Sequence, residues 1–458
     1  MTSSLLAPRP QTGLAPSQQS GPAGTTRHAR RSLPPARRLG DRALPAWPVT
    51  ALFALYPLWW LLGLGPFVVA AAGAIALALM ALRGRVGLPP SWLWWASFLA
   101  WSLLSVVMID SGGRLVGFVQ RWSEMLGAVL LGLYAYNAPE LADRRRVVRS
   151  LSFMVAWLTV GGWLGMLFPY GRVTTPTLAA LPRSIASNSY VTELLSPRFA
   201  EVQDPWGATE AFVRPAAPFP YTNGWGNTFV LVTLVLAALA VRAGRRTRWL
   251  LALAWLAALP PATATLNRGI LVGLGSAGVY VAARRVRDVR PRHWAQLAAA
   301  VTAVGVAVLA SGAADRLSER TSTSTTTQDR AALYAETFER TLASPLLGWG
   351  APRPSRTLPV SAGTQGELWF LMFSYGFVGL GLFVGSLLAL ILVTWRVRDL
   401  ESTLLHAVPV ALAVMMIFYG IDGLQLTMAL WCALVLLPRP GRRPVVNAEE
   451  YPNAEEHP

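Results

Sequence analysis

Long apolar segments recur along the chain between Trp47 and Leu437, and most are long enough to cross a membrane as a helix. The hydrocarbon core of a bilayer is about 30 Å thick and takes roughly 20 helical residues to span. Only 14% of the 458 residues are charged, little more than half the share in soluble proteins. The sequence therefore predicts an all-α, polytopic integral membrane protein and argues against a soluble one.

About twelve helices are expected to span the membrane. Several of the apolar segments are short or contain proline, and we expect the adjacent Pro260 and Pro261 to break the seventh. The predicted spans are 47–65, 66–82, 91–109, 115–136, 147–168, 221–241, 249–266, 269–283, 294–310, 367–394, 403–421 and 423–437.

The charge distribution predicts the orientation. All 40 basic residues are arginine, and the formal net charge is +17. The excess of arginine falls in every second connection and in the terminal segments, which the positive-inside rule places in the cytoplasm. We therefore expect a disordered cytoplasmic tail over 1–46, a membrane domain over 47–437 and a cytoplasmic tail over 438–458. Because the excess charge reports topology, it implies no nucleic-acid partner.

Two outer segments, 169–220 and 311–366, are too long to be simple turns, and such loops are often functional. The first is rich in proline and is expected to be irregular. The second is the large outer loop between the ninth and tenth spans, and its part 329–342 is predicted to be an amphipathic helix. The expected apolar side of this helix carries Leu333, Thr337 or Phe338, and Leu342.

Three arginines outside the cytoplasmic connections are predicted to lie at the outer interface, where a charged side chain is costly: Arg214, Arg268 and Arg330. A guanidinium group can donate two parallel hydrogen bonds to phosphate oxygens, so together these arginines could form a pyrophosphate site. The alternatives are that Arg268 only anchors a helix at the interface and that Arg330 pairs with Asp329 or Glu336.

Arg121 and Glu124 lie three residues apart within the fourth span and are expected to pair on one helix face. The other spans contain almost no acids, which argues against a proton-coupled transporter. None of the four histidines falls in an outer segment, so an outer active site would use a carboxylate as its base or no protein base. The chain has no nucleotide-binding loop and no cluster of metal ligands, so we expect no cofactor and no metal.

Four motifs late in the chain share the order of a known family. They are DRAALY at 329–334, SPLLGWG at 344–350, GTQGELW at 363–369 and YGFVG at 375–379. This region resembles the signature of the O-antigen ligase and polymerase superfamily. Segment 214–223 and the turn 265–269 resemble two further motifs of that family.

The resemblance implies a membrane glycosyltransferase without metal or nucleotide sugar. Members transfer or polymerise a glycan from an undecaprenyl-diphosphate carrier onto an acceptor hydroxyl, at the outer face of the bacterial cytoplasmic membrane, in cell-envelope polysaccharide biosynthesis. It implies that Arg214, Arg268 and Arg330 bind the pyrophosphate. Gln365 stands where many members have a catalytic histidine. Because glutamine cannot act as a base, either Glu367 takes that role or Gln365 only orients the acceptor.

Two other functions fit the same residues. Twelve spans also suit a transporter or a flippase for lipid-linked oligosaccharides, and the missing histidine suits an inactive scaffold of an envelope glycan assembly. The expected partners are the lipid-linked glycan, a glycan or lipid acceptor, and membrane lipids.

Overall fold

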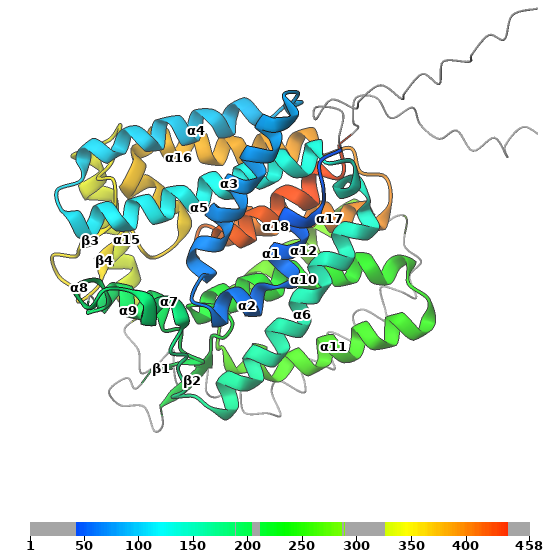
Figure 1. The fold of residues 1–458 in the computed structure, drawn as a ribbon, viewed down its shortest axis with the longest axis horizontal. Coiled ribbons are helices and arrows are strands. Elements are labelled where there is room, and N and C mark those ends of the chain that lie inside the picture. Colours follow the sequence, from blue (N-terminus) through cyan, green and yellow to red (C-terminus); the bar gives the residue numbers. More distant parts are fainter. Residues whose placement is uncertain (1–42, 188, 204–210, 286–287, 289–325, 438–458) are drawn as a thin grey trace, which may run out of the picture. The chain divides into compact units, whose positions relative to one another are not determined.

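The computed structural model describes residues 43–437 apart from 188, 204–210, 286–287 and 289–325. Its contacts divide the chain into Met1–Arg38 and Leu39–Pro458. The first unit lies outside the described residues, and so do residues 1–42 and 438–458 of the two predicted tails. Within the second unit most described residues are helical, and the described strands form two short antiparallel pairs (Figure 1).

Apolar helices form the body of this unit. Four of them, α3, α6, α10 and α16, are long and apolar enough to cross a membrane, and three shorter apolar helices accompany them. The bounds are α1 Trp47–Ala54, α2 Tyr56–Leu61, α3 Gly65–Arg83, α4 Trp92–Leu104, α5 Gly112–Asn137, α6 Arg144–Leu167, α10 Thr222–Arg242, α11 Arg245–Ala264, α12 Arg268–Arg285, α16 Glu367–Val393, α17 Leu400–Met415 and α18 Gly423–Leu434, with 3-10 turns η2 Ser105–Met108 and η3 Pro139–Ala142.

Eleven of the twelve predicted spans coincide with these helices, and the remaining one, 294–310, lies outside the described residues. The first predicted span is divided into α1 and α2, because the chain leaves helical geometry at Leu55 and the next helix begins at Tyr56 with Pro57 in its first turn. The chain is thus an all-α protein of the membrane type. The number of spans stays a prediction.

The expected break at Pro260 and Pro261 was wrong, since α11 continues through both residues to Ala264. Pro261 has no N–H to donate to the carbonyl of Ala257, one helical turn earlier. The indole Nε1 of Trp163 on α6 donates to that carbonyl instead, at 2.9 Å. A neighbouring helix therefore replaces the missing hydrogen bond, which is how apolar helices tolerate proline.

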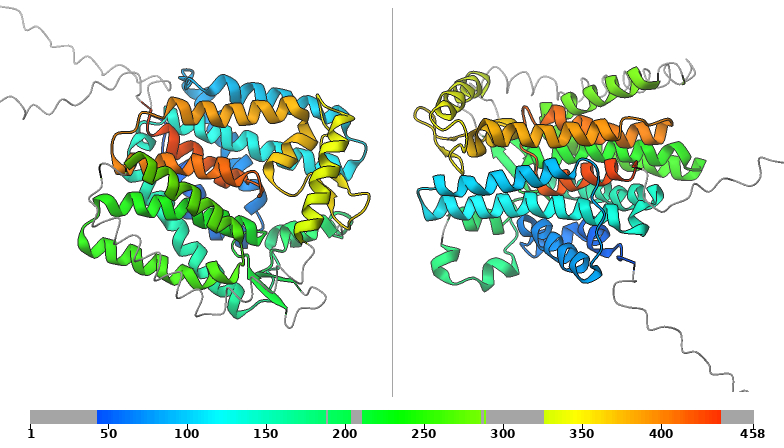
Figure 2. Two further views of the ribbon diagram at one scale, coloured as in Figure 1. Left: turned by 180° about the vertical axis from the view of Figure 1, so that it is seen from behind. Right: turned by 90° about the horizontal axis from the view of Figure 1, so that it is seen from above.

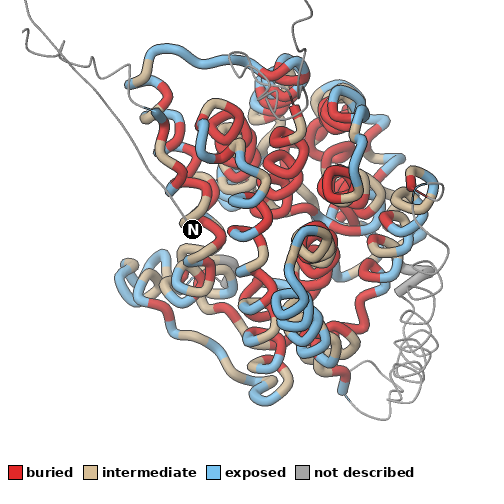
Figure 3. The backbone as a smooth tube through the Cα atoms, turned by 90° about the vertical axis from the view of Figure 1, so that its right-hand side faces the viewer, coloured by how far each residue is buried: buried red, intermediate tan, exposed pale blue. Residues whose placement is uncertain are grey.

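The helix α18 lies in the middle of the bundle, and all twelve of its residues are buried. It contacts α5, α6, α10, α16 and α17 (Figure 2). Burial is concentrated on the inward sides of the helices (Figure 3). Many large apolar residues are nevertheless exposed, among them Leu77, Leu93 and Leu392. Apolar exposure of this extent suits a hydrocarbon surrounding.

Helices α3 and α5 pack closely through glycines. A Cβ atom on Gly73 would collide with the backbone of Gly127, and one on Gly127 would collide with the backbone of Val69. Small residues allow helix backbones to approach in membranes, where packing contacts replace the hydrophobic effect. These glycines fix α5, the helix that carries Arg121 and Glu124, against the amino-terminal helices.

The first outer segment is more ordered than we expected. It contains three short helices and an antiparallel pair in which Glu201 lies opposite Arg214. A connection over 204–211 lies between these strands in sequence. The residues paired across them are not adjacent in the chain, so no local pattern indicates the pairing. The bounds are α7 Pro176–Ala180, α8 Arg183–Ala186, α9 Ser189–Leu195, β1 Ala200–Gln203 and β2 Phe212–Pro215.

The predicted amphipathic helix of the second outer segment is present as α15, Thr326–Leu342, followed by the hairpin of β3, Arg353–Pro354, and β4, Ser361–Ala362. The expected apolar side was partly wrong. Leu333, Thr337 and Thr341 form the buried stripe, whereas Leu342 and Phe338 are exposed. The stripe follows the spacing of four residues, which places Thr341 rather than Leu342 above Thr337.

Candidate functional site

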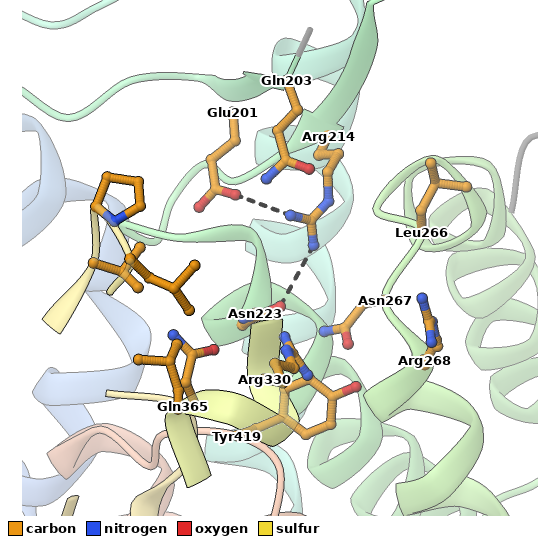
Figure 4. A pocket seen from close by; sticks show the side chains of 14 residues that line it. Glu201, Gln203, Arg214, Asn223, Leu266, Asn267, Arg268, Arg330, Gln365 and Tyr419 are labelled. Carbon is orange, nitrogen blue, oxygen red and sulfur yellow. Dashed lines mark hydrogen bonds and ion pairs between the residues drawn. The ribbon is translucent and has the colours of Figure 1, made fainter. Parts of the chain in front are cut away.

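A cavity of about 340 Å³ opens between the two long segments 169–220 and 311–366 and the ends of several apolar helices (Figure 4). Arg214, Arg268, Arg330 and Gln365 all line it. They come from β2, the start of α12, α15 and the connection before α16, respectively. Four of the five residues assigned above to pyrophosphate binding or catalysis therefore lie around one space.

Arg214 is the most deeply held of the three arginines, with 4% of its surface exposed. Its Nε donates to the carbonyl of Thr265 at 2.8 Å, its Nη1 contacts Glu201 at 3.2 Å, and its Nη2 reaches Oδ1 of Asn223 at 3.5 Å. Burial lowers the pKa of Arg214, Glu201 opposes this, and Arg330 adds to the lowering. An arginine still carries its charge at neutral pH, so Arg214 presents a fixed cation at the wall.

Arg268 is exposed and begins α12 directly after a tight turn. In that turn Leu266 adopts a positive φ of 49°, and the hydroxyl of Thr265 accepts from the amide of Asn267 at 3.3 Å. The turn sets the first residues of α12 against the cavity. Sequence reasoning identified this turn from its motif and from the cost of an arginine at the interface.

Arg330 is partly buried and faces the cavity from α15 (Figure 4). The alternative pairing with Glu336 is not what the structure shows, because that carboxylate binds Arg340 at 2.9 Å and the amide of Arg356 at 3.0 Å. The other proposed partner, Asp329, has a side chain outside the described part. Arg330 lies close enough to Arg214 to lower its pKa.

Asn267 offers the cavity a hydrogen-bond donor. Its Oδ1 accepts from the amide of Gly269 at 2.8 Å, which fixes the orientation of the side-chain amide. Its Nδ2 is buried and has no partner among the described residues, and the residue is 7% exposed. The amide packs where a Cβ atom on Gly226 would lie, so only glycine leaves room for it there. A buried donor of this kind is costly unless a ligand oxygen accepts from it.

Gln365 lies at the cavity beside an aromatic pair. Its backbone carbonyl accepts from the hydroxyl of Tyr334 at 3.4 Å, and Tyr334 stacks on Trp369 with ring centroids 4.1 Å apart. Burial raises the pKa of Tyr334 and Arg330 opposes this, so the phenol remains a neutral donor at pH 7. This contact holds the backbone of Gln365 at the mouth of α16, and the side-chain Nε2 donates to the hydroxyl of Thr364 at 3.4 Å.

Glu367 does not line the cavity with the others. It is 1% exposed, and its Oε2 accepts from Nη2 of Arg121 at 2.6 Å and from the amide of Ile421 at 3.0 Å. Its Oε1 is buried without a hydrogen-bond partner in the described ranges. The catalytic role expected for Glu367 stays a prediction, but its carboxylate faces Arg121 rather than the cavity.

Arg121 and Glu124 contact each other at 3.2 Å, as their spacing predicts, and both belong to a larger polar cluster. Glu124 accepts from the amide of Gly423 at 2.7 Å, and the amide of Glu367 donates to the carbonyl of Tyr419 at 3.0 Å. The cluster ties α5 and the start of α16 to the segment between α17 and α18. That segment carries Tyr419, which lines the cavity, so the buried cluster supports the wall from behind.

The described lining is cationic. It contains three arginines and one carboxylate, that of Glu201, which belongs to β1. Sequence reasoning missed Glu201, Asn267 and Tyr419. Asn267 stands inside the motif that identified Arg268, whereas the pairing of Glu201 with Arg214 depends on the strand register. Among the described residues, no group of three or more His, Cys, Asp or Glu side chains gathers closely enough to hold a metal ion.

Comparison with known proteins adds no relative. No known protein-family profile matches the chain, and no curated protein matches it.

Proposed function

We propose that the protein transfers or polymerises a glycan from a polyprenyl-diphosphate carrier onto an acceptor hydroxyl in cell-envelope polysaccharide synthesis. The reaction takes place at the outer face of a bacterial cytoplasmic membrane. Arg268 and Arg330 bind the diphosphate, and Arg214 stabilises the cavity wall and contributes its positive charge. Gln365 orients the acceptor.

The observation that carries the proposal is the convergence of Arg214, Arg268 and Arg330 on one cavity from three separate parts of the chain. A departing diphosphate develops negative charge, and preorganised cations lower the free energy of that transition state. The unpartnered Nδ2 of Asn267 suits an additional phosphate oxygen. Leu266, Leu333 and Val360 give the same cavity an apolar portion, which suits an amphipathic ligand.

The proposal includes a topology. Twelve helices cross the membrane, both termini are cytoplasmic, and segments 169–220 and 311–366 are outside. Its support is the asymmetric distribution of arginine, together with helices α3, α6, α10 and α16, which are long and apolar enough to span. A cavity built by the two long segments would then open at the level of the outer headgroups.

The first test removes the cavity arginines one at a time. Arg268→Ala and Arg330→Ala should each slow release of polyprenyl diphosphate from its glycan in isolated membranes by about 100-fold or more, with normal protein levels. Arg356→Ala is the control, because that side chain makes an exposed ion pair with Glu339 outside the cavity lining. Unchanged transfer in both cavity variants would refute the diphosphate assignment.

The lipid intermediate distinguishes the alternatives. When the protein is depleted, a transferase leaves its lipid-linked glycan on the outer leaflet, whereas a flippase leaves it on the inner leaflet. An inactive scaffold would be indicated if all the cavity variants restored normal glycan in depleted cells.

A further inference from the structure

Transfer of a glycan to a hydroxyl requires a group that takes the hydroxyl proton. Gln365 cannot do so, and Glu367 is 1% exposed with one oxygen bound to Arg121 and Ile421. Of the described residues that line the cavity, Glu201 alone carries a carboxylate.

Glu201 is held firmly but not enclosed. Its Oε1 accepts from the amide of Thr222 at 3.1 Å, its Oε2 contacts Nη1 of Arg214 at 3.2 Å, and 17% of the side chain is exposed. Each carboxylate oxygen has two lone pairs, so both contacts leave acceptor capacity for a hydroxyl from the cavity.

The partner that orients Glu201 is itself fixed. Arg214 donates to the carbonyl of Thr265 at 2.8 Å, and its own carbonyl accepts from the hydroxyl of Thr222 at 3.1 Å. The strand register places Glu201 opposite Arg214. A base oriented by a second group that is also anchored is the arrangement found at many nucleophilic sites.

We propose that Glu201 is the general base of the transfer reaction, an assignment that rests on the function proposed above. The carboxylate takes the proton as the O–H bond of the acceptor breaks, and the acceptor oxygen forms a bond to the anomeric carbon of the glycan. The bond between that carbon and the diphosphate oxygen breaks, and its electron pair leaves on the diphosphate beside the arginines. The carboxylic acid then returns its proton to water.

The test uses the full-length protein in lipid nanodiscs, with lipid-linked glycan extracted from depleted cells and its acceptor. Glu201→Gln should lower the rate of polyprenyl diphosphate release by at least about 100-fold. Binding of polyprenyl diphosphate without glycan, used as the probe, should stay within about twofold. The wild-type rate should fall in acid, as a carboxylate base requires, and the residual rate of the variant should not.

Two matched variants complete the experiment. Glu193→Gln makes the same chemical change in the same outer segment, at an ion pair with Arg198 away from the cavity, and should leave the rate and the binding unchanged. Glu367→Gln tests the other carboxylate, and a selective loss of rate there with normal rate in Glu201→Gln would overturn the assignment.

The remaining outcomes separate this assignment from the proposed function. Equal loss of rate and of probe binding in Glu201→Gln would mean that Glu201 only holds Arg214, and would overturn its role as base while the transfer function stands. Wild-type protein that binds the probe but releases no diphosphate would refute the transfer function and the base together.

Discussion

At the scale of one residue, the side-chain amide of Asn267 leads to a testable prediction. Asn267→Asp keeps the acceptor for the amide of Gly269 but replaces the buried Nδ2 donor with a negatively charged oxygen. A hydrogen bond to a charged group contributes about 1.5–3 kcal/mol, so Kd for polyprenyl diphosphate in nanodiscs should rise at least about tenfold.

The same variant should unfold at a somewhat lower temperature when no ligand is present, because its new carboxylate oxygen is buried without a hydrogen-bond partner in the described part of the chain. The Nδ2 donor has no partner in the described part of the chain, so its removal breaks no hydrogen bond there. Equal affinity of the two proteins for the diphosphate would show that Asn267 does not face the ligand.

The residues of the site differ in how visible they are in the sequence. Arginines at the outer interface are costly, and that cost drew attention to Arg214, Arg268 and Arg330 before any contact was known. A neutral amide and a carboxylate in a long outer segment have no such cost. Glu201 and Asn267 therefore became candidates only through the strand register and the turn that aim them at the cavity.

At the scale of an element, Glu336 on α15 fastens the hairpin of β3 and β4. Its carboxylate binds Arg340 at 2.9 Å and accepts from the Ser355 hydroxyl and the Arg356 amide. The hairpin tip brings Val360 to the cavity. Glu336→Gln should weaken this fastening by about 2 kcal/mol, and amide hydrogen exchange at 355–360 should become faster.

The control for this variant lies one turn away on the same helix. Glu339→Gln removes an exposed ion pair with Arg356, and exposed pairs contribute little, so exchange at the hairpin should not change. Equal acceleration in both variants would mean that net charge, and not the bonds of Glu336, controls the hairpin.

The pH dependence of the hairpin follows from the same carboxylate. Burial opposes ionisation of Glu336, but the hydrogen bonds from Ser355, Arg340 and the Arg356 amide outweigh it and lower its pKa below the ordinary 4.5. A lowered pKa in the folded state means that the stabilisation is complete above pH 4.5 and is lost as the pH falls through the lower value. Exchange in Glu336→Gln should lack this acid transition.

Elements differ in how far the sequence determines them. The apolar helices were predicted within a few residues because each must bury or present an apolar surface over its whole length. The strands β1 and β2 have four residues each and pair across a connection of eight, so their formation depends on contacts with Thr222 and Thr265 through Glu201 and Arg214. The prolines of α11 did not break the helix. The indole of Trp163 that replaces the missing hydrogen bond comes from α6, so the sequence around the prolines does not reveal it.

At the scale of the whole membrane unit, the site and the topology depend on each other. The cavity is built at the start of α10, the turn between α11 and α12, the start of α16 and the segment between α17 and α18. These chain positions alternate with the arginine-rich connections, so the positive-inside rule assigns all of them to the outer side. One misplaced span would place parts of the cavity on opposite sides.

Cysteine labelling tests this directly, because Cys432 is the one cysteine of the chain and is fully buried. Tyr170→Cys introduces a thiol just after α6, at a position 80% exposed, and Arg396→Cys introduces one in the exposed connection after α16. In spheroplasts a membrane-impermeant maleimide should label the first variant at once and the second only after permeabilisation. Wild-type protein supplies the background. Labelling of both from outside, or of Arg396→Cys alone, would contradict the topology, and with it the assignment of the arginine cavity to the outer face.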